Sequence, residues 1–197
     1  MKPADVQFAW RGWILGALFT GLAFARWRSA GPVEPLGLIP VALGALYRFH
    51  AGRYIPGHTN SPRLSGKALA LRGPYRYGRH PLYLSNLAII AGLILFADCL
   101  PLWEAALLFG IACAHHALLA RTEERYLASI WGEAYLGYLR VTPRWFGLPP
   151  MSAPGEPASA GVPDREAMAV SWKRQGANLG KSAACALVLW ILAAVHR

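Results

Sequence analysis

Five apolar segments divide this chain, and they constrain its fold more than any other feature. They cover residues 10–27, about 35–49, 82–97, about 102–120 and 177–195. Each is somewhat shorter than the roughly 20 residues that span a bilayer as a helix, but flanking tryptophan, tyrosine and arginine side chains extend the effective length. The sequence therefore predicts an all-α, polytopic integral membrane protein with about five transmembrane helices.

Charged residues are few and unevenly spread. They make up 15% of the chain, against roughly 25% in soluble domains. The net charge is +10, and residues 51–80 contain six bases and no acid. Such a stretch also occurs in nucleic-acid-binding proteins, but between apolar segments it indicates a cytoplasmic loop that follows the positive-inside bias and meets anionic lipids. We predict no nucleic-acid partner and a bacterial inner-membrane protein, with its N-terminus and active site in the cytoplasm.

The segments and the loops between them suggest four parts. Residues 1–50 hold two N-terminal transmembrane helices, and 51–146 form the core with the basic loop, a helical hairpin and a short amphipathic helix. Residues 147–171 are a proline- and glycine-rich linker, and 172–197 hold a C-terminal transmembrane helix. This last helix is a candidate surface for oligomer formation.

Two alternatives concern the first segment and the cysteines. The first segment has the basic start and the AFA sequence, at 23–25, of a cleaved signal peptide, although its flanking tryptophans favour a membrane anchor. The three cysteines lack metal-binding spacing, so they are predicted to be small buried hydrophobes, and no metal site is predicted.

The third and fourth segments form the predicted hairpin, because only the short turn 98–101 joins them. Two polar sequences, GPYRYGRHPLYL at 73–84 and RTEERYL at 121–127, then lie on the same side of the membrane. A short amphipathic helix follows, GEAYLGYLRVTPRW, between Gly132 and Pro143. We expect the two polar sequences to form a single site.

Ionisable residues at membrane depth strengthen this expectation. His116 and Glu123 are seven residues apart and share a helix face, with Leu119 between them. Such groups are costly in lipid and suggest function. The alternative is that helix neighbours satisfy His115 and His116, and that Glu123 and its neighbour only mark where the helix enters water.

GPYRYGRHPLYL, then EER, then WGEAYLGYLRVTPR together resemble the isoprenylcysteine carboxyl methyltransferase family and related phospholipid methyltransferases, over about residues 60–145. The resemblance implies an all-helical membrane enzyme with a cytoplasmic pocket for S-adenosyl-L-methionine and a lipophilic or lipid substrate. Carried over by position, it implies cofactor contacts at Leu69, Tyr75, His80, Pro81, Leu82, Tyr83 and Glu123, and weaker candidates at Lys67 and Ala70.

The chain departs from the family pattern at several positions. Ser85 stands where the family usually has glycine, and Leu119 where some members carry a substrate-binding arginine. Arg121 is a candidate replacement, but it points about 200° away on a helix. The final motif reads VTPRW, and the linker and last helix lie outside the resemblance. These departures do not affect the assignment of the cofactor. They mean that the resemblance does not identify the methyl acceptor as a prenylcysteine.

Methyl transfer from a sulfonium mainly requires a positioned acceptor and the exclusion of water. No catalytic residue is therefore obligatory, and the candidates are His116 and Arg121. We expect His116 and Trp103 to line the substrate path. The basic loop favours a carboxylate acceptor that forms a methyl ester, although membrane topology alone also explains these charges.

The cofactor-binding roles follow from chemistry. The aromatic rings of Tyr75 and Tyr83 would pack against the adenine or the sulfonium. Glu123 would accept hydrogen bonds from the cofactor. His80, with Arg79 or Arg76, would hold its carboxylate. On this prediction Glu123→Ala abolishes cofactor binding and Glu124→Ala spares it.

Two other functions fit parts of the sequence. Membrane sterol and enone reductases share part of this layout, and their NADPH phosphates would suit the basic loop. A non-catalytic membrane scaffold is the third alternative, and it predicts that neither S-adenosylhomocysteine nor NADPH stabilises the protein.

Overall fold

The structure is a computed structural model that describes residues 3–29, 32–55, 69–148 and 165–195. All regular structure in these ranges is helical, as the sequence predicts. The elements are α1 (Pro3–Arg28), η1 (Pro35–Gly37), α2 (Leu38–Gly52), η2 (Gly73–Arg76), α3 (Pro81–Ala97), α4 (Leu102–Trp131), α5 (Glu133–Val141) and α6 (Arg165–Val195).

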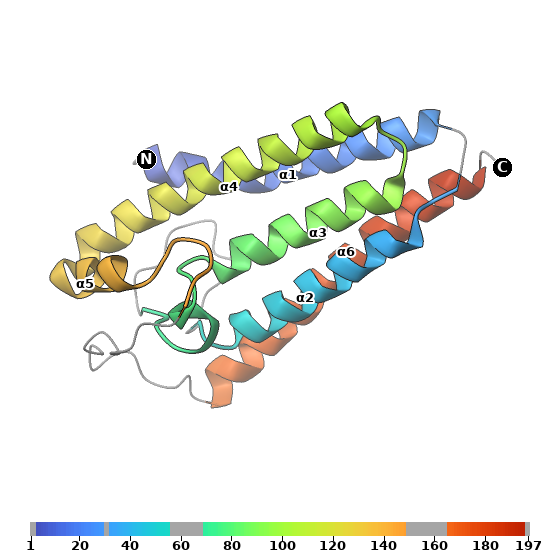
Figure 1. The fold of residues 1–197 in the computed structure, drawn as a ribbon. Coiled ribbons are helices and arrows are strands. Elements are labelled where there is room, and N and C mark those ends of the chain that lie inside the picture. Colours follow the sequence, from blue (N-terminus) through green and yellow to red (C-terminus); the bar gives the residue numbers. More distant parts are fainter. Residues whose placement is uncertain (1–2, 30–31, 56–68, 149–164, 196–197) are drawn as a thin grey trace.

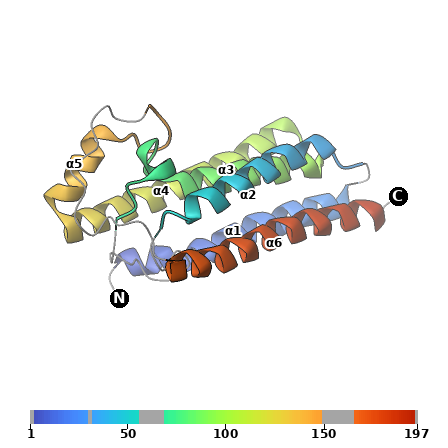
Figure 2. The same ribbon diagram turned by 90° about the horizontal axis from the view of Figure 1, so that it is seen from below.

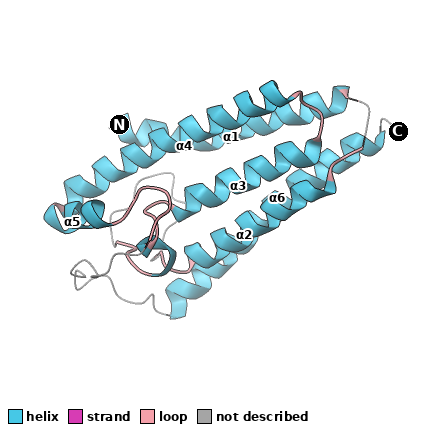
Figure 3. Cartoon of the chain, in the orientation of Figure 1, coloured by secondary structure: helices cyan, strands magenta, loops and turns pink. Residues whose placement is uncertain are grey.

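Five long helices form a bundle of two layers. Helices α2, α3 and α4 make one layer with α3 in the middle, and α1 and α6 make the other (Figures 1 and 2). The short helices η2 and α5 both lie at one end of the bundle (Figure 3). The main hydrophobic core lies between the layers, where Leu22 of α1, Val41 of α2, Leu93 of α3 and Leu189 of α6 are buried together. The candidate functional site therefore lies at the end of the bundle where η2 and α5 are found.

Glycines allow α2 and α3 to pack closely. A β-carbon at Gly44 would lie 2.8 Å from the carbonyl oxygen of Ser85, and one at Gly92 would lie 2.6 Å from that of Gly37. Ser85, the departure from the family glycine, donates its hydroxyl proton to the carbonyl oxygen of Pro81 at 2.7 Å, within its own helix. Its polar group is therefore satisfied, and Gly44 on the facing helix makes room for the α3 backbone.

Helix α1 is an integral part of the bundle. Leu22 belongs to the core, and the Arg26 side chain is fully buried. Its guanidinium donates to the carbonyl oxygens of Ala97, at the end of α3, and Ser29, at 2.9 and 2.8 Å. Helix α1 thus contributes a core side chain to this fold, and the choice between a membrane anchor and a signal peptide stays a prediction.

The predicted hairpin is present, with its turn at Asp98, which adopts a left-handed conformation (φ 43°) after the last residue of α3. Helix α4 then continues well past its apolar part, to Trp131. Gly132, with φ 51°, ends it, and α5 runs to Val141, shortly before Pro143. The short amphipathic helix is thus confirmed. Glu123 and Glu124 lie on the same helix as His116.

The C-terminal helix begins earlier than predicted. Residues 149–164 of the predicted linker lie outside the described residues, but α6 already starts at Arg165 rather than at residue 172. The apolar pattern did not reveal this because charged and polar residues, among them Arg165, Glu166, Lys173 and Arg174, interrupt the apolar residues in the first turns of α6.

Helix α4 is, by length and composition, the one helix in the described ranges that could cross a membrane unaided. Pro81–Ala97 and Leu179–Val195 are apolar but shorter. The topology of five spans therefore stays a prediction.

Candidate functional site

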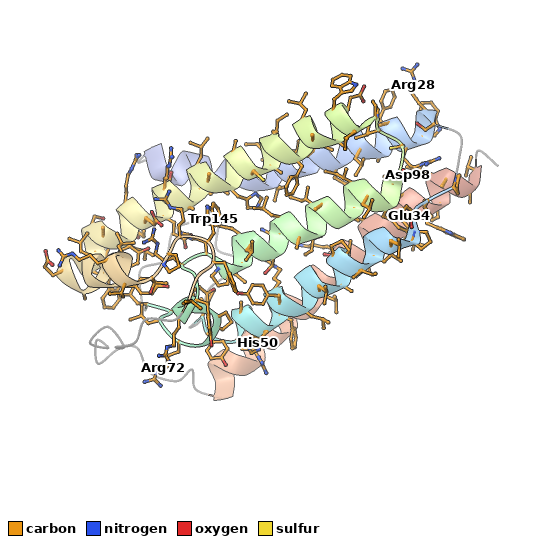
Figure 4. The ribbon with its side chains drawn as sticks, viewed as in Figure 1. Arg28, Glu34, His50, Arg72, Asp98 and Trp145 are labelled. Atoms are coloured by element: carbon orange, nitrogen blue, oxygen red, sulfur yellow. The ribbon has the colours of Figure 1, made fainter. Side chains whose placement is uncertain are left out.

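The two predicted polar sequences meet at one end of the bundle. The N-terminus of α3, the helix η2, the second half of α4 and the segment after α5 converge there. Figure 4 shows Trp145, from that last segment, near the start of α3. We call the surface formed by Tyr75, His80, Tyr83 and Glu123 the cup.

His80 lies between the two acidic side chains of α4. Its Nδ1 is 3.5 Å from Glu123 Oε2, and its Nε2 is 3.2 Å from Glu124 Oε1. The imidazole is buried, and the Glu123 side chain is 31% exposed. The structure therefore brings His80 and Glu123 into contact, as the hairpin geometry requires.

The pKa of His80 reflects this position between carboxylates. Burial alone would lower it, but hydrogen bonds from the ring to Glu123 and Glu124 outweigh burial and raise the pKa above 6.5. A protonated ring donates from both nitrogens, so it can satisfy both carboxylates at once.

A pH dependence of stability follows from this raised pKa. A histidine whose folded-state pKa is raised contributes stability below its unfolded pKa and loses that contribution as pH rises through the folded value. We expect the melting temperature of the wild type to fall as pH rises above about 6.5, and His80→Gln to flatten this part of the curve. Thermal unfolding of both proteins across pH tests this, and an equal slope in the two would contradict it.

Glu124 carries more contacts than Glu123, which sequence reasoning did not anticipate. Arg144 donates from Nε to Oε1 at 3.1 Å and from Nη2 to Oε2 at 2.7 Å, and Arg79 Nε lies 2.9 Å from Oε1. The Glu124 side chain is 8% exposed. A buried carboxylate with two guanidinium partners organises its surroundings, so the expectation that Glu124 is dispensable does not fit this geometry.

Residues 142–147, which we call the strap, lie against residues 77–79, the segment between η2 and α3. The backbone N–H of Arg79 donates to the carbonyl of Pro143 at 3.1 Å, and that of Gly147 donates to Tyr77 at 2.8 Å. Arg79 Nη1 also donates to the carbonyl of Thr142 at 3.0 Å. Arg79 therefore joins the strap to Glu124, rather than standing free to hold a cofactor carboxylate.

Tyr75 has a buried hydroxyl that finds no hydrogen-bond partner among the described residues. Burial, and then the negative charge of Glu123, hold its pKa well above 10.0. Its backbone carbonyl accepts a hydrogen bond from the Tyr138 hydroxyl at 2.7 Å. Leu69 is buried against Tyr135 and Tyr138, so it supports this wall of the cup from behind.

Tyr83 connects the cup to the bundle interior. Its ring stacks on His80 with 5.3 Å between centroids and 12° between planes, and it meets His116 edge-on at 5.6 Å. Pro81 is buried as the first residue of α3, and Leu82 is half-buried behind the cup. The structure therefore brings Tyr83, His80 and Glu123 into direct contact with one another through His80.

His116 is fully buried and belongs to a polar chain that the sequence analysis missed. It contacts Asn86 of α3, which contacts Arg48 of α2. A signal was present in the sequence, since Asn86, next to Ser85, places an amide in a largely apolar segment.

Several candidates lie away from this region. Arg121 and Arg76 are exposed, and Leu119 is buried, so Arg121 does not supply a charge at the position of Leu119. Trp103 is 66% exposed in the first turn of α4, about 20 Å along the helix from His116. The structure therefore does not bring Trp103 and His116 to one wall. Ala70 is half-buried beside Leu69, and Lys67 lies outside the described residues.

A comparison with protein-family models matches residues 36–134 to the phospholipid methyltransferase family. The chain belongs to this family. The match spans α2, the cup and the α3–α4 hairpin, and it agrees with the resemblance seen in the sequence. Membership of a methyltransferase family favours a methyltransferase over the reductase alternative.

Two curated relatives carry names from metal resistance. The chain is 35% identical over 137 residues to the cobalt-zinc-cadmium resistance protein CzcN of Cupriavidus metallidurans, across 68% of this chain and 58% of that protein. It is 30% identical over 135 residues to the nickel-cobalt-cadmium resistance protein NccN of Alcaligenes xylosoxydans xylosoxydans, across 68% and 59%. The match thus covers less than two thirds of either relative. No solved structure matches the chain.

Proposed function

We propose that this protein is an S-adenosyl-L-methionine-dependent membrane methyltransferase that acts on a lipophilic or amphiphilic acceptor. The observation that carries the proposal is the cup itself. Within the matched family region, His80 at the head of α3 meets Glu123 of α4 at 3.5 Å, although 43 residues separate them in the chain.

The residues of the cup fit this cofactor. The cofactor offers hydroxyl and ammonium donors, an adenine ring and a positive sulfonium. Glu123 is the less buried of the two acids and offers a carboxylate acceptor. Tyr83 offers a half-buried aromatic face, and the Tyr75 hydroxyl is a buried polar group without a partner among the described residues. We therefore assign cofactor contacts to Tyr75, His80, Tyr83 and Glu123.

When bound, the cofactor supplies an electrophilic methyl group. The protein's part is to hold the reactants and exclude water. Glu124 and its arginines fix His80 and the strap, while Tyr83 forms the boundary between the cup and the apolar interior. An acceptor reaching the cup from the lipid side would meet Tyr83 first, which suits a lipophilic molecule.

The distribution of side chains supports insertion in a membrane. Figure 4 shows Arg28, Glu34 and Asp98 at one end of the bundle and His50 and Arg72 at the other. Between these ends, large apolar side chains are exposed on the outer faces, among them Leu43, Leu107, Leu118, Leu187 and Trp190. Such surfaces are stable against lipid rather than water. The many arginines around the cup favour a cytoplasmic cup.

The names of the relatives suggest a physiological setting of metal resistance. The described residues contain no group of three or more His, Cys, Asp or Glu side chains that could hold a metal ion. Our proposal assigns this chain a methylation reaction.

Ligand-induced stabilisation tests the proposal. We expect S-adenosylhomocysteine to raise the melting temperature of the full chain in detergent, because a ligand that binds the folded state stabilises it by about 2.7 kcal/mol at a hundredfold excess over its dissociation constant. NADPH at the same concentration should have no effect. Stabilisation by NADPH alone would favour a reductase, and no stabilisation by either would favour a scaffold.

Two tyrosine variants sharpen this test. Tyr75→Phe removes a hydroxyl without a partner in the described residues, so the unliganded protein should keep its melting temperature but bind S-adenosylhomocysteine less tightly. Tyr138→Phe removes the hydrogen bond to the Tyr75 carbonyl, so it should lower the stability of the unliganded protein. Equal ligand affinity in wild type and Tyr75→Phe would remove Tyr75 from the cofactor site.

A further inference from the structure

A polar chain crosses three helices behind the cup. Arg48 Nη1 on α2 donates to Asn86 Oδ1 on α3 at 2.7 Å and to the carbonyl oxygen of Leu82 at 3.3 Å. Asn86 Nδ2 lies 3.3 Å from His116 Nε2 on α4. His116 Nδ1 lies 2.8 Å from the carbonyl oxygen of Ala112, one turn earlier. The family resemblance assigns no role to Arg48 or Asn86.

The chemistry of these groups sets the direction of each hydrogen bond. A guanidinium only donates, so the oxygen of Asn86 faces Arg48 and its NH2 group faces His116. His116 Nε2 must then accept. The carbonyl of Ala112 also only accepts, so His116 Nδ1 must carry the proton. Both ends of the chain therefore require the same neutral Nδ1–H tautomer of His116.

This arrangement opposes a proton on Nε2. Such a proton would face the NH2 group of Asn86, and turning the amide round would direct that NH2 group at Arg48 instead. The first arrangement sets donor against donor at a ring with no exposed surface, and the second does so at the Arg48 guanidinium. Among the described residues, the other titratable groups in ring contact with His116 are His115 on its own helix and Tyr83 on α3.

We propose that Arg48 and Asn86 are positioning residues that hold His116 as the neutral Nδ1–H tautomer, with its ring edge-on to Tyr83. Because Tyr83 also stacks on His80, a fixed His116 ring holds one wall of the cup in place. His116 is then a support rather than the proton acceptor of the reaction. This last consequence rests on the proposed methyltransferase function, whereas the tautomer does not.

The tautomer is directly measurable. Full-length protein with 15N-labelled histidine, in lipid nanodiscs, gives long-range proton–nitrogen correlation spectra that distinguish the two neutral tautomers from the imidazolium. His116→Gln identifies the His116 signals. We expect a neutral ring with the proton on Nδ1 from about pH 6 to about pH 8, a range in which an ordinary histidine titrates. An Nε2–H tautomer, or protonation within this range, would overturn the proposal.

Two substitutions test the roles of the partners. Asn86→Asp replaces the donor to His116 by a carboxylate, so His116 should take a proton on Nε2 and give the imidazolium spectrum. Arg48→Lys keeps a group that only donates, so the wild-type tautomer should persist. An unchanged His116 spectrum in Asn86→Asp, or loss of the tautomer in Arg48→Lys, would refute the assignment.

Activity supplies a second readout. If the protein transfers methyl groups, Asn86→Asp should lower kcat by about 10- to 100-fold, as expected when a supporting group is misplaced, and weaken the binding of S-adenosylhomocysteine by a clearly smaller factor, because Tyr83 is one of several proposed cofactor contacts. A comparable loss of cofactor affinity would indicate general damage to the cup and refute a positioning role. The proposed methyltransferase function has its own test. It is contradicted if the wild type neither binds S-adenosylhomocysteine nor transfers methyl groups, even when His116 has the expected tautomer.

Discussion

Replacing Glu124 by glutamine is expected to lower the stability of this protein more than any other conservative change at the cup. The substitution keeps the size of the side chain but leaves Arg79, Arg144 and His80 without their shared carboxylate. Breaking a buried ion pair costs about 3–5 kcal/mol. The Arg144 side chain is 34% exposed, so we expect about 2–3 kcal/mol here, since water screens that partner.

Thermal unfolding in detergent measures this loss. For a chain of this size, 2–3 kcal/mol corresponds to a fall in melting temperature of roughly 4–12 °C. S-adenosylhomocysteine binding should be lost as well, because the strap and His80 depend on the same carboxylate.

Glu123→Gln is the matched control. It changes the same chemical group one residue away, but the contact of Glu123 with His80 is longer, at 3.5 Å, and the side chain is 31% exposed. We expect nearly unchanged stability of the unliganded protein and weaker ligand binding. If Glu124→Gln melted like the wild type, the ion pairs around Glu124 would not organise the cup.

Gly78→Ala is expected to detach the strap. A β-carbon at this position would lie 1.9 Å from the carbonyl oxygen of Trp145 and 2.8 Å from its carbonyl carbon. These are backbone atoms, so no side-chain rotation relieves the overlap. We expect a destabilisation of about 1–3 kcal/mol, typical of overpacking, and faster tryptic cleavage after Arg144.

Gly137→Ala on α5 is the control for Gly78→Ala. A β-carbon there meets no atom within 4 Å, and alanine favours a helix over glycine by about 1 kcal/mol. This variant should match or exceed the wild type in stability and keep the wild-type rate of cleavage. If Gly78→Ala were cleaved no faster than Gly137→Ala, the close contact between Gly78 and the strap would not exist in solution.

Local features of the sequence predict several elements well. The short turn at 98–101 allows only an antiparallel hairpin, and this brings the polar sequences before α3 and late in α4 to one end of the bundle. Gly132 and Pro143 bound α5 because each disrupts helical geometry at its own position. These predictions hold because the cause lies within a few residues of the effect.

Choices between neighbouring residues depend on packing. Glu123 and Glu124 differ by about 100° around the helix axis, and nothing local decides which of them turns inward. The structure buries Glu124 because Arg79 and Arg144, from two other elements, reach it there. The family resemblance pointed to Glu123 and could not foresee the second role.

What the sequence alone determined is the helical class, the hairpin and the set of polar residues at one end of the bundle, because periodicity, turn chemistry and apolar length act locally. What only the tertiary structure decided is which of these residues meet. The contacts of Arg48 with Asn86 and of Gly78 with Trp145 join segments 38 and 67 residues apart. Their existence depends on how helices rotate and cross as the core packs, and no local pattern encodes that rotation.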